Sequence, residues 1–177
     1  HGLVCLLHEK PFAGVNGSGK HNNWSLSTDD GINLFKPSKK PETDTRFQLV
    51  VGCVMKAVKK HALLLRTAAS NPGNDHRLGA NEAPPAIISI FLGDQIGGVV
   101  DQIIEKGYAD SSIPAGMLDF GVKECPAVDK DPTDRNRTSP FAFTGNRFEF
   151  RMVASSCNVA EPNIVLNAMM AEAFSDA

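Results

Sequence analysis

A glycine-rich stretch of this 177-residue sequence ends in a histidine and has the residue types of a ligand-binding site. Within it, Gly14, Gly17 and Gly19 precede Lys20 and His21. Because glycine has no side chain, backbone N–H and C=O groups can come close to a bound molecule. An imidazole beside them can bind a metal or donate a hydrogen bond to an anion. The stretch therefore predicts a site for a metal, an anion or both.

The same residues permit a second interpretation, a phosphate-binding P-loop. Gly14 to Lys20 fits the pattern G-x-x-x-x-G-K, in which backbone amides and the lysine hold phosphate. However, His21 stands where a P-loop has the Ser or Thr that binds Mg²⁺. The residues that follow, Asn22 to Gly31, are poor helix formers. The P-loop remains an alternative, and it predicts a helix directly after Lys20 and no metal contact from His21.

A second group of polar residues lies on a predicted strand from Asn146 to Val153, where charged and apolar side chains alternate. Arg147, Glu149 and Arg151 would share one face of this strand. Arginine offers planar paired donors to phosphate or carboxylate, and glutamate offers oxygen to Mg²⁺ or Mn²⁺. The strand is thus either a platform for a metal and a polyanion or an ordinary solvent-facing strand.

Two irregular segments carry further candidate side chains. Arg77 and Glu82 lie in a polar loop that leads into an apolar strand, which is a common place for chemistry. Arg135 to Ser139 is rich in hydrogen-bond donors and belongs to a stretch, Asp134 to Phe143, that we predict to be turn-like. Taken alone, each segment could equally be a solvated loop.

Helices and strands must position these groups, and hydrophobic periodicity predicts both. Apolar residues at three- and four-residue spacing predict helices over Thr45–Ser70 and Asp94–Lys106 and from Glu161 onward. In the last helix we expect an apolar core stripe: Ile164, Leu166, Met169, Met170, Ala173 and Phe174. Apolar runs predict buried strands at Gly2–Leu7 and Ala86–Leu92.

The composition indicates a globular protein with one core. Hydrophobic residues make up 42% and charged residues 21%, and no apolar run approaches the roughly 20 residues that span a bilayer. The net charge of -2, without a basic stripe, argues against nucleic acid as a partner. The four cysteines, Cys5, Cys53, Cys125 and Cys157, form no close pair, so we expect reduced thiols packed as small apolar groups in a cytoplasmic protein. Because the chain begins at His1 with a strand-like stretch, we expect it to be part of something longer.

Five motifs in order resemble glutamine synthetase, and their wording is similar to the long-chain bacterial type III branch. The resemblance covers nearly the whole chain. The matching segments are Asn16–Ser25, Glu82–Pro84, Arg135–Arg137, Arg147–Arg151 and Glu161–Asn163. The resemblance implies ATP-dependent ligation of ammonia to L-glutamate through a γ-glutamyl phosphate, with Mg²⁺ or Mn²⁺ as cofactor and ATP as co-substrate.

The resemblance also implies roles for residues around the nucleotide. His21 and Glu149 match ligands of the metal that sits on the nucleotide phosphates. Ser25 lies near the position that meets ATP, and Arg147 matches an arginine near its phosphates. Arg137 matches a catalytic arginine on the transferred phosphoryl group.

A second set of roles concerns glutamate and ammonia. Asn16 and Gly17 match a loop that touches glutamate and helps cover the site. Arg77 and Arg151 match residues that hold the carboxylate of glutamate. Glu82 matches the catalytic loop glutamate that closes the site and helps deprotonate ammonium. Closing the site would exclude water from an acyl phosphate that hydrolyses readily.

The chain departs from the family pattern at a few positions. Asn23 stands where many relatives have a second histidine, and Ala142 stands where many have another arginine. The spacing from Arg77 to Glu82 is one residue shorter than in common relatives. The role of Asn23 therefore stays open, and a nucleotide contact must come from a residue other than Ala142.

For the fold, the resemblance implies an α+β arrangement with a curved, mostly antiparallel sheet lining the site and helices outside. It identifies residues 1–177 as the C-terminal portion of a catalytic domain, without the N-terminal β-domain and the earlier catalytic strands. The implied partners are the rest of that domain and other subunits of a ring-type homo-oligomer, with no nucleic acid and no membrane. We expect the isolated chain to be inactive. A γ-glutamyl-amine ligase of the same fold is an alternative.

Overall fold

The computed structural model describes residues 1–5, 19–74, 78–79, 84–113, 117–118, 128–129, 139–155 and 157–177. Within them, four strands form a mixed sheet in the order β1-β6-β5-β2: β1 (Gly19–Trp24), β6 (Phe148–Ala154), β5 (Phe141–Phe143) and β2 (Ile90–Phe91). The pairs β1–β6 and β6–β5 are antiparallel, and β5–β2 is parallel. A separate antiparallel pair joins β3 (Met117–Leu118) to β4 (Val128–Asp129).

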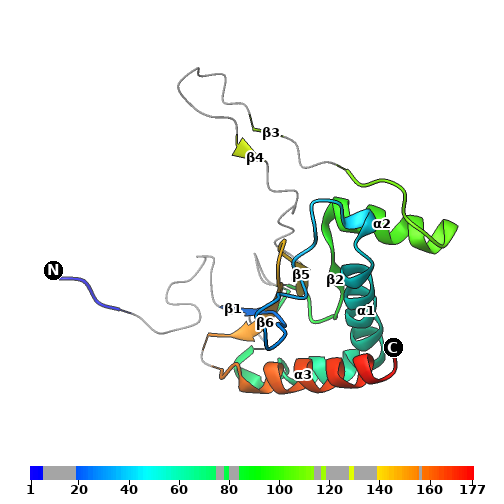
Figure 1. Ribbon diagram of the computed structural model, residues 1–177. Helices are drawn as coiled ribbons and strands as arrows, with labels where there is room; N and C mark the ends of the chain where they lie inside the picture. Colours follow the sequence, from blue (N-terminus) through cyan, green and yellow to red (C-terminus); the bar gives the residue numbers. More distant parts are fainter. Residues whose placement is uncertain are drawn as a thin grey trace.

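Three α-helices accompany the sheet in this part of the chain: α1 (Thr45–Thr67), α2 (Gly93–Lys106) and α3 (Ala160–Ser175). Short 3-10 turns, Pro41–Thr43 and Pro72–Asn74, flank α1. Helices α1 and α3 lie beside the sheet and meet near the C-terminus (Figure 1). The predicted α+β class, with a mostly antiparallel sheet, is confirmed. None of the helices in the described residues combines the length and hydrophobicity needed to cross a bilayer.

Local signals explain where the helices begin and end. The Asp44 side chain accepts a hydrogen bond of 3.0 Å from the backbone N–H of Phe47, which caps the start of α1. Helix α2 ends at Gly107, whose φ of 83° is a conformation that favours glycine. The apolar spacing of the sequence therefore predicted both helices, although α1 ends at Thr67 rather than at Ser70.

An aromatic cluster forms the core between the sheet and the helices. Phe141 stacks on Phe148 at 4.8 Å between ring centroids, and Phe35 meets Phe148 edge-on at 5.2 Å. Trp24 of β1 lies 5.1 Å from Phe35, and Phe47 of α1 lies 5.7 Å from Phe143. Each such pair contributes about 0.5–1.5 kcal/mol beyond the area it buries. The cluster joins β1, β5, β6 and α1 into one core and holds the strands at fixed positions.

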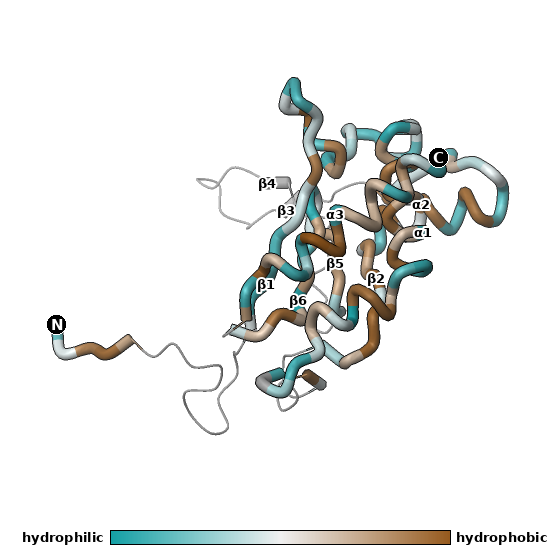
Figure 2. The backbone as a smooth tube through the Cα atoms, turned by 90° about the horizontal axis from the view of Figure 1, so that it is seen from below, coloured by the Kyte–Doolittle hydropathy of each residue, from teal (hydrophilic) through white to brown (hydrophobic). Residues whose placement is uncertain are grey.

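The predicted strand at Gly2–Leu7 is wrong in its described part. Residues 1–5 form no strand, and Leu3 and Val4 are 89% and 81% exposed. This hydrophobic segment extends away from the helices and the sheet (Figure 2). An apolar run becomes a strand only when another strand pairs with it, and residues 1–5 pair with none of the described strands. Cys5 is exposed as well, contrary to the expectation of a packed thiol.

The other cysteines differ among themselves. Cys53 is buried as expected, and burial raises the pKa of its thiol. Cys157 is partly buried, and Cys125 lies outside the described residues.

Two further predictions about strands are wrong. Of the predicted strand Ala86–Leu92, only Ile90–Phe91 pairs, and Ile87 is 69% exposed. Conversely, Phe141–Phe143, predicted as part of a turn, forms the fully buried strand β5. In both cases, the sheet decides the outcome, because β5 lies between two strands while β2 lies at the edge.

The core stripe of α3 is narrower than predicted. Leu166, Met169, Met170 and Ala173 are buried, but Ile164 is 66% exposed and Phe174 38% exposed. A regular helix turns about 100° per residue, so only part of a wide apolar stripe can face one neighbouring layer.

Candidate functional site

The candidate site lies on the face of the β1–β6 pair opposite the aromatic core. On β1, His21 and Asn23 are exposed while Asn22 and Trp24 are buried. On β6, Glu149 is partly exposed between two fully buried phenylalanines. Successive side chains of a strand point to opposite faces, and Asn23 pairs directly with Glu149. The polar residues of the two strands therefore share one face, which we call the outer face.

Three side chains of this face meet at one carboxylate oxygen. His21 Nδ1 lies 3.6 Å from Glu149 Oε2, and Arg151 Nε donates a hydrogen bond of 3.0 Å to the same Oε2. The His21 side chain is 57% exposed, Glu149 20% and Arg151 5%. The buried Arg151 side chain thus holds the Glu149 carboxylate from the protein interior, while the His21 imidazole lies beside the carboxylate at the surface.

The separation of His21 and Glu149 suits two ligands of one divalent cation. At 3.6 Å, the two atoms are beyond good hydrogen-bond distance. Metal–nitrogen and metal–oxygen bonds of about 2.0–2.2 Å place two ligand atoms of one ion at a similar separation. A carboxylate has roughly four lone-pair positions, so the bond from Arg151 does not exhaust Glu149. Carboxylate oxygen suits Mg²⁺ and Mn²⁺, and imidazole nitrogen is a common ligand of first-row divalent metals.

An irregularity in the strand pairing helps aim His21. Lys20 pairs with Val153 and Asn22 pairs with Phe150, so the register shifts by one residue between them. The single residue His21 therefore lies opposite two residues of β6, Arg151 and Met152. Such a bulge bends the strand and redirects side chains, and bulges are frequent beside functional sites.

The predicted nucleotide residues Ser25 and Arg147 lie just beyond the end of the β1–β6 ladder. Ser25 follows Trp24 and Arg147 precedes Phe148, and Trp24 and Phe148 form its last pair. Both Ser25 and Arg147 are exposed, and Arg147 Nε donates to Asn146 Oδ1 at 3.1 Å. Ser25 is two residues along the chain from Asn23, and Arg147 two from Glu149, which is at most about 7 Å for an extended chain.

Five of the predicted site residues lie outside the described residues: Asn16, Gly17, Arg77, Glu82 and Arg137. Their roles remain predictions. The structure brings His21, Glu149 and Arg151 together on the outer face, and Ser25 and Arg147 are exposed directly beyond the last pair of the β1–β6 ladder. In the described residues, no three His, Cys, Asp or Glu side chains gather as a metal site, so this face offers a pair of ligands.

The two departures from the family pattern have distinct surroundings. Asn23 donates a hydrogen bond of 3.3 Å to the backbone carbonyl of His21. Ala142 of β5 is 1% exposed and is paired with Glu149 of β6. Because its side chain is a methyl group, β5 places no charge opposite Glu149.

One buried residue behind the site was absent from the sequence prediction. Asn74 is 1% exposed, and its Nδ2 donates to the carbonyls of Ala69 at 2.8 Å and Met152 at 2.7 Å. It therefore ties the segment after α1 to β6, next to Arg151. Asn74 follows the helix-ending segment Asn71-Pro72-Gly73, and a turn-forming Asn at this place is the signal that the sequence offers.

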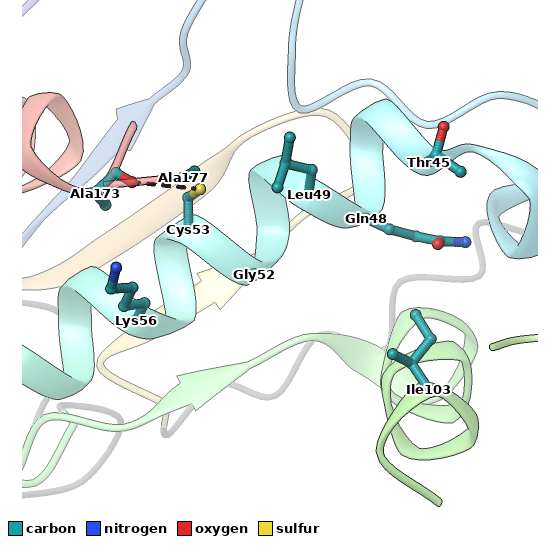
Figure 3. A pocket seen from close by; sticks show the side chains of 9 residues that line it. All are labelled: Thr45, Gln48, Leu49, Gly52, Cys53, Lys56, Ile103, Ala173 and Ala177. Carbon is teal, nitrogen blue, oxygen red and sulfur yellow. Dashed lines mark hydrogen bonds between the residues drawn. The ribbon is translucent and has the colours of Figure 1, made fainter. Parts of the chain in front are cut away.

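A surface groove in the described residues belongs to another part of the molecule. It has a volume of about 450 Å³ and lies along α1, lined by residues that include Leu49, Cys53 and Lys56, together with Ile103 of α2 and the C-terminal Ala177 (Figure 3). None of the candidate site residues lines it.

The P-loop alternative disagrees with the structure. A P-loop requires a helix directly after its lysine, whereas Lys20 lies inside strand β1, which continues to Trp24. The backbone of β1 pairs with β6 instead of starting a helix.

Comparison with known proteins supports the resemblance to glutamine synthetase independently of the structure. The chain is 59% identical over 175 residues to a type-3 glutamine synthetase of Dictyostelium discoideum, and 51% identical over 178 aligned positions to a glutamine synthetase of Bacteroides fragilis. A glutamine synthetase of Butyrivibrio fibrisolvens is 53% identical over 149 residues. These matches cover 98%, 99% and 84% of this chain. No protein-family model matches the chain.

The matches cover 24%, 24% and 21% of the relatives, so the chain spans about a quarter of their length. The resemblance to glutamine synthetase is thereby confirmed over nearly the whole chain, and one relative carries the type-3 name.

Proposed function

We propose that this chain, which is homologous to about a quarter of a glutamine synthetase, supplies part of a site that ligates ammonia to L-glutamate at the expense of ATP. The observation that carries the proposal is the meeting of His21, Glu149 and Arg151 around one carboxylate oxygen. Phosphoryl transfer requires metal ions and cationic side chains that neutralise charge, and this group offers two metal ligands and an arginine. The names of the relatives support the same chemistry.

In this proposal, His21 Nδ1 and Glu149 hold the divalent cation, Mg²⁺ or Mn²⁺, that accompanies ATP. Bound there, the cation would neutralise charge on the nucleotide phosphates. Arg151 fixes the orientation of Glu149 through Nε. Its guanidinium carries five N–H donors in total, and we assign it also to the carboxylate of glutamate.

The remaining assignments extend along the same face and into its surroundings. Ser25 and Arg147, just beyond the end of the β1–β6 ladder, would contact ATP and its phosphates. Arg137 would stabilise the transferred phosphoryl group while γ-glutamyl phosphate forms. Glu82 would close the site and take a proton from ammonium.

Three further residues would bind glutamate itself. Asn16 and Gly17 would cover it, and Arg77 would hold its carboxylate together with Arg151. These contacts would keep water from the acyl phosphate, which is the main requirement once it has formed.

The 177-residue chain by itself should form no glutamine. The described residues provide a pair of metal ligands, whereas Mg²⁺ and Mn²⁺ take about six. We propose that the rest of the catalytic domain, of which this is the C-terminal portion, and neighbouring subunits of a cytoplasmic ring-type homo-oligomer complete the site. Steady ATP- and ammonia-dependent glutamine formation by the purified chain would contradict this.

The test uses the full-length protein that contains this chain. His21→Ala and Glu149→Ala should each weaken Mn²⁺ binding about 10-fold or more and lower ATP- and ammonia-dependent glutamine formation. Lys20→Ala, which changes the neighbour of His21 on β1, is the matched control and should bind Mn²⁺ like the parent. Wild-type Mn²⁺ affinity in both ligand variants would refute the metal assignment. Replacing ammonia by alkyl amines in the assay distinguishes a γ-glutamyl-amine ligase.

A further inference from the structure

Two asparagines of α3 hold the inner face of β1. Asn163 and Asn167 are four residues apart and therefore lie on the same side of the helix. Asn163 Oδ1 accepts a hydrogen bond of 2.9 Å from Asn22 Nδ2, and Asn167 Oδ1 accepts one of 2.9 Å from Trp24 Nε1. Asn22 and Trp24 are the two buried residues of β1, on either side of Asn23.

The Asn22–Asn163 pair is unusual for its position. Asn22 is 8% exposed and lies on the strand face that packs toward α3, where the neighbouring β6 residues Phe148 and Phe150 are fully buried. Asn163 is only partly buried, so the bond removes mainly the Asn22 amide from water, and an apolar side chain at position 22 would avoid that cost. The amide pair therefore adds little net stability, and its effect is to specify which residues meet.

The register of β1 needs such additional contacts because the β1–β6 pairing is irregular at His21. The register of β1 on β6 shifts between Lys20 and Asn22, directly at His21. A slip of one residue along β1 would turn His21 toward the core and Asn22 toward the outer face. The backbone hydrogen bonds could re-form after such a slip, whereas the two side-chain bonds to α3 could not.

We propose that Asn163 and Asn167 are positioning residues, and that α3 holds β1 in the one register that places His21 beside Glu149. The proposal rests on the metal site described above and extends it to a helix that contributes no ligand. The spacing of the two bonds fits both elements. Asn22 and Trp24 are two residues apart on a strand, and Asn163 and Asn167 are four residues apart on a helix; each step is about 6–7 Å long.

The experiment compares variants of the full-length protein. The double variant Asn22→Leu/Asn163→Leu replaces the amide pair by apolar side chains, and Asn163→Asp keeps the accepting oxygen. We expect the double variant to retain or raise its thermal midpoint while Mn²⁺ affinity falls about 10-fold, and Asn163→Asp to stay within about 3-fold of the parent. A merely structural role would move stability and affinity together.

Two readouts keep the outcomes distinct. A crystal structure of the double variant should show β1 in a shifted or mixed register, with Asn23 no longer opposite Glu149. Parent-like register and parent-like Mn²⁺ affinity in that variant would overturn the proposal. If His21→Ala also binds Mn²⁺ normally, the metal assignment fails. The register of β1 on β6 in the crystal structure of the double variant then decides whether the asparagines are positioning residues.

A milder variant covers the case in which the double variant does not fold. Trp24→Phe keeps an aromatic ring against Phe35 and Phe141 but removes the N–H that Asn167 accepts. It should lower Mn²⁺ affinity by about 2- to 5-fold with a small change in thermal midpoint. Unchanged affinity together with an unchanged register would count against the proposal.

Discussion

Strands β6 and β2 belong to the same sheet, but only β6 comes close to its predicted span, which was Asn146–Val153. β6 extends from Phe148 to Ala154 and pairs on both sides, with β1 and with β5. β2 is reduced to Ile90–Phe91 at the edge of the sheet, although its sequence is richer in β-branched residues. The difference teaches that pairing partners, more than strand propensity, decided which stretch became the platform of the site.

The largest expected effect tests that contrast in the core. Phe148→Ala removes a fully buried ring that contacts Phe35, Phe141 and Phe143, and should cost about 3–5 kcal/mol of folding stability. Ile87→Ala, in the stretch that failed to form a strand, should cost less than about 0.5 kcal/mol because Ile87 is 69% exposed. Thermal unfolding of the full-length protein measures both. Similar losses in the two variants would remove the distinction between the regions.

A middle-sized effect is expected where β6 is anchored from behind. Asn74→Asp replaces a donor to the carbonyls of Ala69 and Met152 by an acceptor, and should cost about 2–3 kcal/mol. Asn158→Asp is the control, because the Oδ1 of Asn158 accepts from the N–H of Ala160 and a carboxylate preserves that bond. Hydrogen exchange at the amides of β6 should rise in the first variant alone. Unchanged exchange at β6 would show that Asn74 does not stabilise the strand.

The smallest effect concerns the junction of α1 with α3, the helix that follows β6. Hydrogen bonds from Lys60, then from His61, hold the pKa of Glu172 below its ordinary value of 4.5. A lowered pKa in the folded state means that this contribution is present above the ordinary pKa and is lost as the pH falls through the folded value. The thermal midpoint of the parent should therefore fall as the pH is lowered from 5 to about 3. The midpoint of the Glu172→Gln variant should fall less over the same range, because the variant lacks this titrating group. Identical pH profiles of the two proteins would exclude the contribution.

The contrast between β6 and β2 also shows how much could be predicted from residues alone. The alternation of Glu149 and Arg151 with three apolar side chains correctly predicted which face of β6 carries charge, although Arg147 lies just before the strand and Arg151 is buried. The same kind of reasoning placed Phe141–Phe143 in a turn, because Ser139 and Pro140 are turn signals and the strand has only three residues. β5 exists because Phe141 and Phe143 pair with Phe150 and Phe148, a non-local cause.

For the candidate site, the sequence supplied residue types and the tertiary structure supplied their meeting. His21 and Glu149 were candidates from a glycine-rich stretch and an alternating strand far apart in the chain. The resemblance implied that His21 and Glu149 bind one metal, but not that Arg151 shares the same carboxylate oxygen, which depends on the bulge in the β1–β6 pairing. The contacts of Asn163 and Asn167 with β1 could not be predicted either, although Asn163 belongs to one of the matching segments.

The sequence by itself determined the local features of this protein: the spans of α1 and α2, the cap at Asp44, the stop at Gly107 and the charged face of β6. These depend on interactions between residues close in the chain, whose energies are expressed wherever the segment lies. Only the tertiary structure decided that residues 19–24 are a strand, that β5 is buried, and that His21 faces Glu149. Strand pairing joins distant segments, and its register is selected by what the whole core and α3 can bury.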